Sequence, residues 1–194
     1  MPLPESDLHG NVPDAAETCL VIIDMINAFT FDDAEKLFPA VVQAADWIAR
    51  LKQRAAAARV PVIYVNDNFG KWRSDFRQVV ARCGAPNSRG RDIVRVIEPG
   101  AEDHFILKPR HSAFFQTALD SLLKYLRVKR VILAGIAIDA CVQFTANDAY
   151  LRQIDLWIPA DCVAGISKKV ERQSLEYFSR VLSADTRLST GKLD

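Results

Sequence analysis

Residues 131–145, VILAGIAIDACVQFT, constrain the fold of this chain more than any other stretch. A short apolar run meets Gly135, and a segment with helical periodicity follows from about residue 139, with Cys141 in its first turn. This pattern is typical of a buried parallel strand, a sharp turn and a helix. A thiol in a first turn feels the positive end of the helix dipole, which favours the thiolate. Cys141 is therefore a candidate nucleophile; the alternative is a small buried apolar filler, because free cysteines are often buried.

Strand-like and helix-like segments alternate over most of the chain. Continuous apolar runs predict strands, and apolar residues spaced by three and four predict helices. The predicted strands are 19–23, 60–65, 104–107, 130–134, 154–158 and 186–189, and the predicted helices are 34–58, 75–82, 112–126, 139–152 and 167–183. The alternation predicts an α/β fold, in which helices cover both faces of a parallel sheet. A length of 194 residues suits a single domain, with residues 1–17 as an N-terminal arm.

Several reactive or polar groups directly follow predicted strands. Asp24, Asp67, Lys108 and the turn Gly135–Cys141 all stand at such positions. Ligands of parallel α/β sheets bind beyond the carboxyl ends of the strands, so these groups predict a site. A carboxylate at the end of a buried strand needs a cation or a donor, and Lys108 could be that partner for Asp24. The alternative is an ion pair that only ties two strands together.

Charge and composition disfavour several classes of partner. The formal net charge of +1 gives no electrostatic reason to expect nucleic acid or a membrane surface as a partner. No apolar run approaches the roughly 18 residues of a membrane span, and the N-terminus lacks the order of a signal peptide. The four cysteines are scattered and form no CxxC pair, which predicts reduced thiols and a cytoplasmic protein.

Four motifs resemble those of the isochorismatase-like cysteine hydrolases. They are VIIDMINAF, LKPRHSAF, GIAIDACVQFTANDAY and IPADCVAG, and the likeness runs from about residue 18 to 188. The resemblance implies a three-layer α/β/α fold with a six-stranded parallel sheet in the order 3-2-1-4-5-6. It also implies a catalytic triad of Asp24, Lys108 and Cys141.

The resemblance assigns each triad member a role. Asp24 would be the general base that takes the thiol proton and later activates water. Lys108 would stay charged and lower the pKa of the Cys141 thiol. The family carries a cis peptide at the turn that corresponds here to Ile136–Ala137. That turn would aim the backbone N–H groups of Ala137 and Cys141 at one point as an oxyanion hole.

Departures from the family pattern bear on the cofactor and the substrate. Nicotinamidases of the family hold a metal with an Asp and two histidines after the second strand, but here Asp67 is followed by no histidine before His104. The sequence therefore predicts no metal and no other cofactor, and it disfavours nicotinamide as the substrate. Isochorismatases of siderophore pathways generally lack the nucleophilic cysteine, so Cys141 favours amide over vinyl-ether cleavage. Ile138 stands where the family usually has threonine, which removes a hydroxyl beside the turn.

The pocket wall is the part of the site that the sequence defines least. Aromatic residues near strand ends can line a pocket or belong to the core, and polar residues there can bind an amide or anchor a loop. The candidates are Phe29, Asn66, Asp67, Phe69, Trp72 and Phe114. Arg110 and His111 are expected to be solvated or to touch a carboxylate of the substrate.

The pattern as a whole predicts a metal-independent cysteine amidohydrolase. It would cleave a C–N bond of a small amide or carbamoyl substrate through a thioester on Cys141. The alternatives are an isochorismatase-type vinyl-ether hydrolase and a non-catalytic binding module on the same fold. The expected partners are a small-molecule substrate and further copies of the chain, as a dimer or tetramer.

Overall fold

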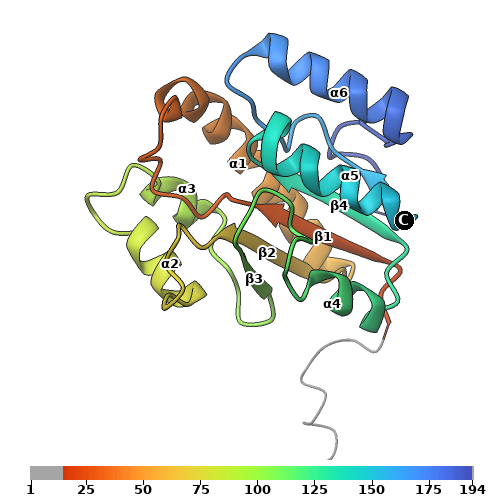
Figure 1. Ribbon diagram of the computed structural model, residues 1–194, viewed down its shortest axis with the longest axis horizontal. Helices are drawn as coiled ribbons and strands as arrows, with labels where there is room; N and C mark the ends of the chain where they lie inside the picture. Colours follow the sequence, from red (N-terminus) through yellow and green to blue (C-terminus); the bar gives the residue numbers. More distant parts are fainter. Residues whose placement is uncertain (1–14, 194) are drawn as a thin grey trace, which may run out of the picture.

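Five parallel strands form one sheet in the order β3-β2-β1-β4-β5 (Figure 1). The structure, a computed structural model, describes residues 15–193. The strands are β1 (Thr18–Ile23), β2 (Val62–Asp67), β3 (His104–Lys108), β4 (Arg130–Gly135) and β5 (Asp155–Trp157). The central strand β1 pairs with β2 and β4, and its residues Cys19–Ile23 are all buried. A continuous apolar run is what a strand with neighbours on both sides and helices on both faces requires.

The predicted sixth strand at 186–189 is absent, so the prediction of six strands was wrong. A single parallel bridge between Trp157 and Asp185 stands in its place. Beyond it, side chains rather than a neighbouring strand take up backbone amides. The Asp185 carboxylate accepts from the amide of Arg187, and the Asp161 carboxylate accepts from that of Ser189. These side-chain bonds, one local and one from a distant loop, take the place of a strand ladder.

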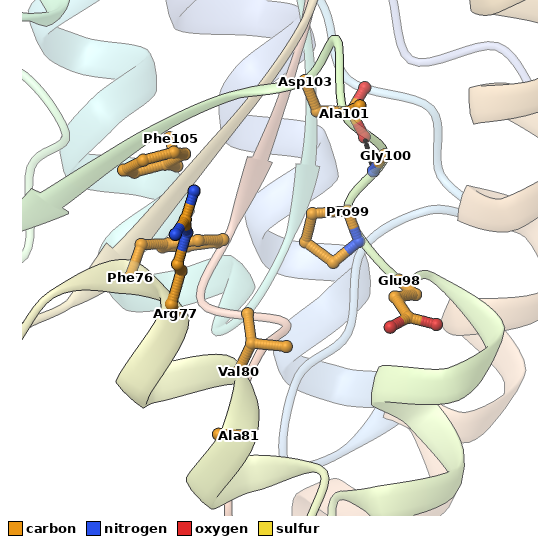
Figure 2. Close-up of a pocket in the computed structure, with 10 residues that line it drawn as sticks. All are labelled: Phe76, Arg77, Val80, Ala81, Glu98, Pro99, Gly100, Ala101, Asp103 and Phe105. Carbon is orange, nitrogen blue, oxygen red and sulfur yellow. Dashed lines mark hydrogen bonds between the residues drawn. The ribbon is translucent and has the colours of Figure 1, made fainter.

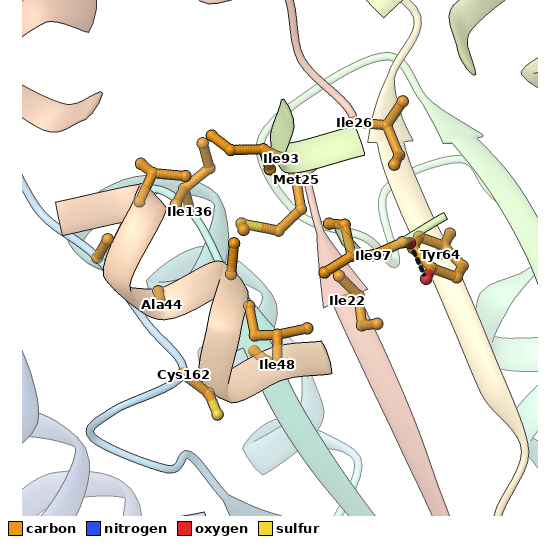
Figure 3. Close-up of a cluster of buried hydrophobic side chains, with 14 of the residues drawn as sticks. Ile22, Met25, Ile26, Ala44, Ile48, Tyr64, Ile93, Ile97, Ile136 and Cys162 are labelled. Atoms are coloured by element: carbon orange, nitrogen blue, oxygen red, sulfur yellow. Dashed lines mark hydrogen bonds between the residues drawn. The ribbon is translucent and has the colours of Figure 1, made fainter. Parts of the chain in front are cut away.

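Alternate residues of β1 enter two separate cores, which gives the predicted three layers. Leu20 and Ile22 pack toward α1 (Ala34–Ala57), in a cluster that Figure 3 shows in part. Cys19, Val21 and Ile23 pack toward the opposite face, which carries α4 (Leu119–Tyr125), α5 (Gln143–Leu151) and α6 (Lys168–Leu182). The period of two along a strand produces this division.

The connection between β2 and β3 is the segment that the sequence pattern describes least well. It holds two helices, α2 (Phe76–Cys83) and α3 (Arg91–Val96), where one was predicted at 75–82. Gly90 fixes its course, because a side chain there would put a Cβ 1.7 Å from the carbonyl oxygen of Asn27. The segment is thereby held against the loop that follows β1.

Two helices on the Cys141 side differ from their predicted form. The segment predicted as a helix from 112 is irregular up to α4, because side chains of α5 capture its backbone and Ser112. The helix predicted at 139–152 is divided into a short π-helix, η2 (Ile138–Val142), and α5. Within residues 15–193, the structure contains no helix with the length and apolar character of a membrane span.

Candidate active site

Asp24 and Lys108 meet at the carboxyl edge of the sheet, although β2 separates their strands. Asp24 directly follows β1 in a left-handed conformation, with φ 52°, and Lys108 ends β3. The lysine side chain reaches across the end of β2, and its Nζ lies 2.8 Å from Asp24 Oδ2. The lysine side chain is fully buried and that of the aspartate is 8% exposed. A charge pair this buried must satisfy itself internally, which ties both side chains in place.

The Lys108 ammonium also contacts the candidate nucleophile. Its Nζ lies 3.3 Å from Cys141 Sγ and 3.2 Å from the carbonyl oxygen of Arg110. An ammonium has three hydrogens, and here three acceptors surround it: Asp24, Cys141 and the Arg110 carbonyl. The second oxygen of Asp24 accepts from the backbone amide of Asp67 at 2.7 Å. The acid, the ammonium and the sulfur therefore converge on one point, in fixed orientations.

Burial dominates the protonation states of the three groups. Desolvation raises the pKa of Asp24, and Lys108 only partly offsets this. For Lys108, desolvation lowers the pKa, but Asp24 and Cys141 together outweigh it and the net shift is upward. Burial, and next the charge of Asp24, raise the pKa of the Cys141 thiol to about 12, against a smaller lowering by Lys108.

The prediction of a lowered thiol pKa was therefore wrong in its net direction. Lys108 does favour the thiolate, as expected, but the water-poor surroundings and the carboxylate outweigh the ammonium. At neutral pH the resting site holds a neutral thiol beside a charged ammonium. A base must then take the proton at the moment when the sulfur attacks.

The turn between β4 and η2 brings Cys141 to this edge. The peptide bond Ile136–Ala137 is cis. Gly135 has φ 117°, and a Cβ there would lie 2.1 Å from the carbonyl oxygen of Ile23, so only glycine fits. The oxyanion role of the Ala137 and Cys141 amides stays a prediction. Ile138, in place of the usual threonine, is fully buried and packs against Gly165, where an added Cβ would lie 2.8 Å from its Cγ2.

His111 is a site residue to which sequence reasoning gave too little weight. It is exposed, as expected, but its Nδ1 lies 3.5 Å from Cys141 Sγ, and its ring stacks on that of Phe144 with centroids 5.4 Å apart. Its position three residues after Lys108, in a loop that leaves a strand end, was the available signal. Nothing in the sequence pattern showed which way the loop would turn.

The six candidates for the pocket wall separate into two groups. Phe29 and Phe69 line a hollow of about 770 Å³ together with Lys71, Arg82 and Arg89. Trp72, whose side chain is 79% exposed, lines an adjoining hollow that also includes Lys71 and Arg82.

The other three candidates are not placed as a pocket wall. Phe114 is buried in the core, with the Arg152 guanidinium 4.5 Å above its ring. Asn66 is fully buried and donates to the carbonyl oxygen of Ile26. The Asp67 carboxylate accepts from the amide of Phe69 at 2.5 Å and so anchors its own loop.

A further hollow of about 390 Å³ lies beside β3 (Figure 2). α2, β3 and the segment 98–103 form it, and the stacked rings of Phe76 and Phe105 lie along it. None of its lining residues comes from the loops that directly follow β1 and β2, whereas Phe29 and Phe69 of the first hollow do, so we do not assign the chemistry to it.

Among the described residues, no three His, Cys, Asp or Glu side chains gather closely enough to hold a metal ion. The prediction that no metal is needed rests on the sequence and stays a prediction. His111, one of the two histidines in residues 15–193, contacts the sulfur of Cys141.

Comparisons with known proteins agree on one family. A family model described as the isochorismatase domain matches residues 18–186. The isochorismatase family protein YaaI of Bacillus subtilis is 41% identical over 170 residues, which cover 88% of this chain and 93% of that protein. The ureidoacrylate amidohydrolase RutB of Serratia proteamaculans is 27% identical over 83% of this chain and 75% of its own length. Among solved structures, the N-carbamoylsarcosine amidase of Thermoplasma acidophilum superposes with a TM-score of 0.72 at 25% identity, covering 92% of this chain and all of that one.

Proposed function

Because the chain belongs to the isochorismatase family and is a hydrolase, we propose that it is a cysteine amidohydrolase acting on a small amide or carbamoyl substrate. One observation carries this proposal: the Lys108 ammonium contacts both the Asp24 carboxylate and the Cys141 sulfur. A purely structural ion pair between two strands would not require a half-buried thiol in contact with its ammonium. Two relatives, the ureidoacrylate and N-carbamoylsarcosine enzymes, are amidohydrolases by name.

The proposed reaction begins with a neutral thiol. Asp24 accepts the S–H proton while the sulfur attacks the substrate carbonyl, because a thiol with a pKa of about 12 forms little thiolate beforehand. Lys108 remains charged and stabilises the developing thiolate. The backbone amides of Ala137 and Cys141 are the proposed donors to the oxyanion.

Collapse of the tetrahedral intermediate breaks the C–N bond. Asp24 returns its proton to the leaving amine, and the acyl group remains on Cys141 as a thioester. Asp24 then takes a proton from water, whose oxygen attacks the thioester. The carboxylic acid leaves, and the proton on Asp24 returns to the sulfur. Each step needs only the three groups and water, so the proposal includes no metal.

A substrate panel tests this function. The purified protein should release amine or ammonia from some members of a set of small amides, ureas and carbamates, with and without a chelator. Intact-protein mass spectrometry should show an acyl adduct on Cys141, and hydroxylamine should convert it to a hydroxamate. Loss of activity with the chelator would overturn metal independence.

The two rival functions give different results in the same assay. A vinyl-ether hydrolase would act on chorismate-derived substrates and leave no thioester on Cys141. A non-catalytic module would bind panel members without product, and its Cys141 would react no faster than an ordinary thiol. Either result would reject the amidohydrolase proposal.

A further inference from the structure

A network of side-chain bonds fixes the loop after β3 against the helix that carries the nucleophile. The Thr145 hydroxyl donates to the carbonyl oxygen of Cys141 at 2.7 Å and accepts from the amide of Ala113 at 3.0 Å. The Ser112 hydroxyl donates to the carboxylate of Asp148, on the same helix. Three loop residues, Pro109, Arg110 and His111, lie between Lys108 and these attachments, so their positions are restricted at both ends. The last of them is His111.

The imidazole of His111 meets the sulfur from the solvent side. Asp24 and Lys108 contact the site from the buried side of the sheet edge, whereas His111 is exposed and stacks on Phe144. Its Nδ1 lies 3.5 Å from Sγ, within the distance of a hydrogen bond to sulfur. Asp24 also hydrogen-bonds to the Cys141 thiol on the buried side. The sulfur therefore lies between two proton acceptors, and His111 is the one that is open to solvent.

We propose that His111 is a second base for Cys141 and forms a Cys–His pair on the outer side of the site. This rests on the proposed role of Cys141 as nucleophile. The S–H bond breaks and an N–H bond forms at Nδ1, which gives a thiolate beside an imidazolium. When the C–N bond of the substrate breaks, the imidazolium gives this proton to the leaving amine. Forming the two charges together costs less than forming a lone thiolate in a water-poor site.

The charged groups around His111 set the balance of this transfer. The Cys141 sulfur and the Asp24 carboxylate are the groups that carry negative charge on the buried side, and the Lys108 ammonium contacts both of them. Arg110 on the same loop is a cation, and Asp148 on α5 is an anion already engaged by Ser112 and Arg152. Asp24 remains the base for the water step, because it is the group enclosed with the reacting atoms.

Alkylation of Cys141 by iodoacetamide tests the pair without any substrate. In the wild type, the rate should show an inflection with pH that depends on His111. His111→Asn keeps an acceptor near the Nδ1 position but no base, and His111→Phe keeps the stacking on Phe144 alone. Both should slow alkylation at pH 7.5 by about tenfold or more and remove the inflection. A wild-type rate and profile in either variant would overturn the proposal.

Two controls separate this outcome from failure of the proposed function. His104→Asn changes the other described histidine, at the far end of β3, and should leave the profile unchanged. If wild-type Cys141 reacted no faster than the buried Cys19, Cys83 and Cys162, the nucleophile itself would be in question. If it reacted fast and both His111 variants matched it, only the role of His111 would fail.

An independent observation concerns the charge of the substrate. The adjoining hollows described above share Lys71 and Arg82 and also include Arg73 and Arg89, whereas no acidic side chain lines either one. The whole chain has nearly equal numbers of basic and acidic residues, 25 and 24, so composition does not explain this excess. Arg89 pairs with Glu35. Arg82 lies over the ring of Phe69, with 4.6 Å from its Cζ to the centroid.

This cationic surface is linked directly to the triad. The amide of Phe69 donates to the Asp67 carboxylate, and the amide of Asp67 donates to Asp24. We infer that the substrate carries an anionic group, of the carboxylate class, that Arg82 and Lys71 hold while its amide reaches Cys141. A guanidinium that rests on an aromatic ring presents its planar set of donors to such a group.

Two alkylating reagents that differ in charge test this inference, which also rests on Cys141 being reactive. The ratio of the iodoacetate to the iodoacetamide rate at Cys141 should fall by about threefold or more in the double variant Lys71→Gln, Arg82→Gln at low salt. Added salt should lower the wild-type ratio as well. The matched control Lys129→Gln, at the opposite edge of the sheet, should leave it unchanged. An unchanged ratio in the double variant would overturn the inference, whereas slow reaction of wild-type Cys141 with both reagents would count against the nucleophile.

Discussion

Replacement of Cys141 by alanine should abolish turnover, with a fall in kcat of at least about a thousandfold. The sulfur is the atom that forms the covalent intermediate, and neither Asp24 nor Lys108 can replace it as a nucleophile. The fold should survive, because Cys141 is only partly buried and the Asp24–Lys108 pair keeps its 2.8 Å contact without it. Steady-state kinetics and a thermal melt on the same preparation would measure both effects.

A matched cysteine gives the control for this variant. Cys162 is fully buried in the core on the α1 side (Figure 3), so Cys162→Ala should lower the melting temperature and leave kcat nearly unchanged. Cys141→Ala should show the reverse pattern. Retention of amidase activity in Cys141→Ala would contradict the thioester mechanism, whatever the state of the other thiols.

The sequence predicted that Asp24, Lys108 and Cys141 lie at one edge of the sheet, because short patterns determine where the strands before them end; their catalytic roles were implied by the family resemblance. Apolar runs defined the strands before Asp24, Lys108 and Gly135, and parallel strands bring their carboxyl ends to one edge. The residues that follow those strands had then to lie close together. The sheet order and the family motifs needed no knowledge of the loops.

The features that the sequence did not predict depend on contacts between distant segments. Ser112 and Ala113 form hydrogen bonds to α5 and do not continue a helix. These bonds also place His111 beside the Cys141 sulfur. The pKa of Cys141 was predicted in the wrong direction because burial comes from several elements at once, whereas the nearby lysine is visible in a motif. The sheet ends at a single bridge to Asp185, because the backbone amide of Arg187 donates to the Asp185 carboxylate instead of pairing with a strand.

The second large effect concerns stability, and we expect it in Lys108→Met. This change removes the cation beside a carboxylate whose pKa burial already raises. Removing one partner of a buried ion pair lowers the free energy of unfolding by about 3–5 kcal/mol, because the other charge is left buried without a counter-charge. Asp24→Asn should also destabilise the fold, since it leaves the Lys108 ammonium buried without its anion. Both variants should lack activity.

The double variant Asp24→Asn, Lys108→Met distinguishes the interaction between the two side chains from the effect of losing each one alone. It buries no charge, so its loss of stability should be smaller than the sum of the two single losses by at least about 2 kcal/mol. Urea unfolding would measure the three variants, with Glu17→Gln, Lys129→Met as an exposed pair that should show little coupling. Additive losses would mean that Asp24 and Lys108 do not interact as the 2.8 Å contact implies.

The way in which the stability of Lys108→Met depends on pH follows from the direction of the pKa shift of Asp24. A carboxyl group whose pKa is higher in the folded than in the unfolded state holds its proton more tightly when folded. The contribution of Asp24 to stability is therefore greatest at a pH below the pKa of the unfolded state, and it falls as the pH rises through the pKa of the folded state. Without the cation that offsets burial, this fall should extend to higher pH in Lys108→Met than in the wild type. In the double variant residue 24 does not titrate, so the additional fall in stability should disappear. If the fall persisted in the double variant, another group would be its source. The stability loss of Lys108→Met could then not be assigned to an unpaired Asp24 carboxylate.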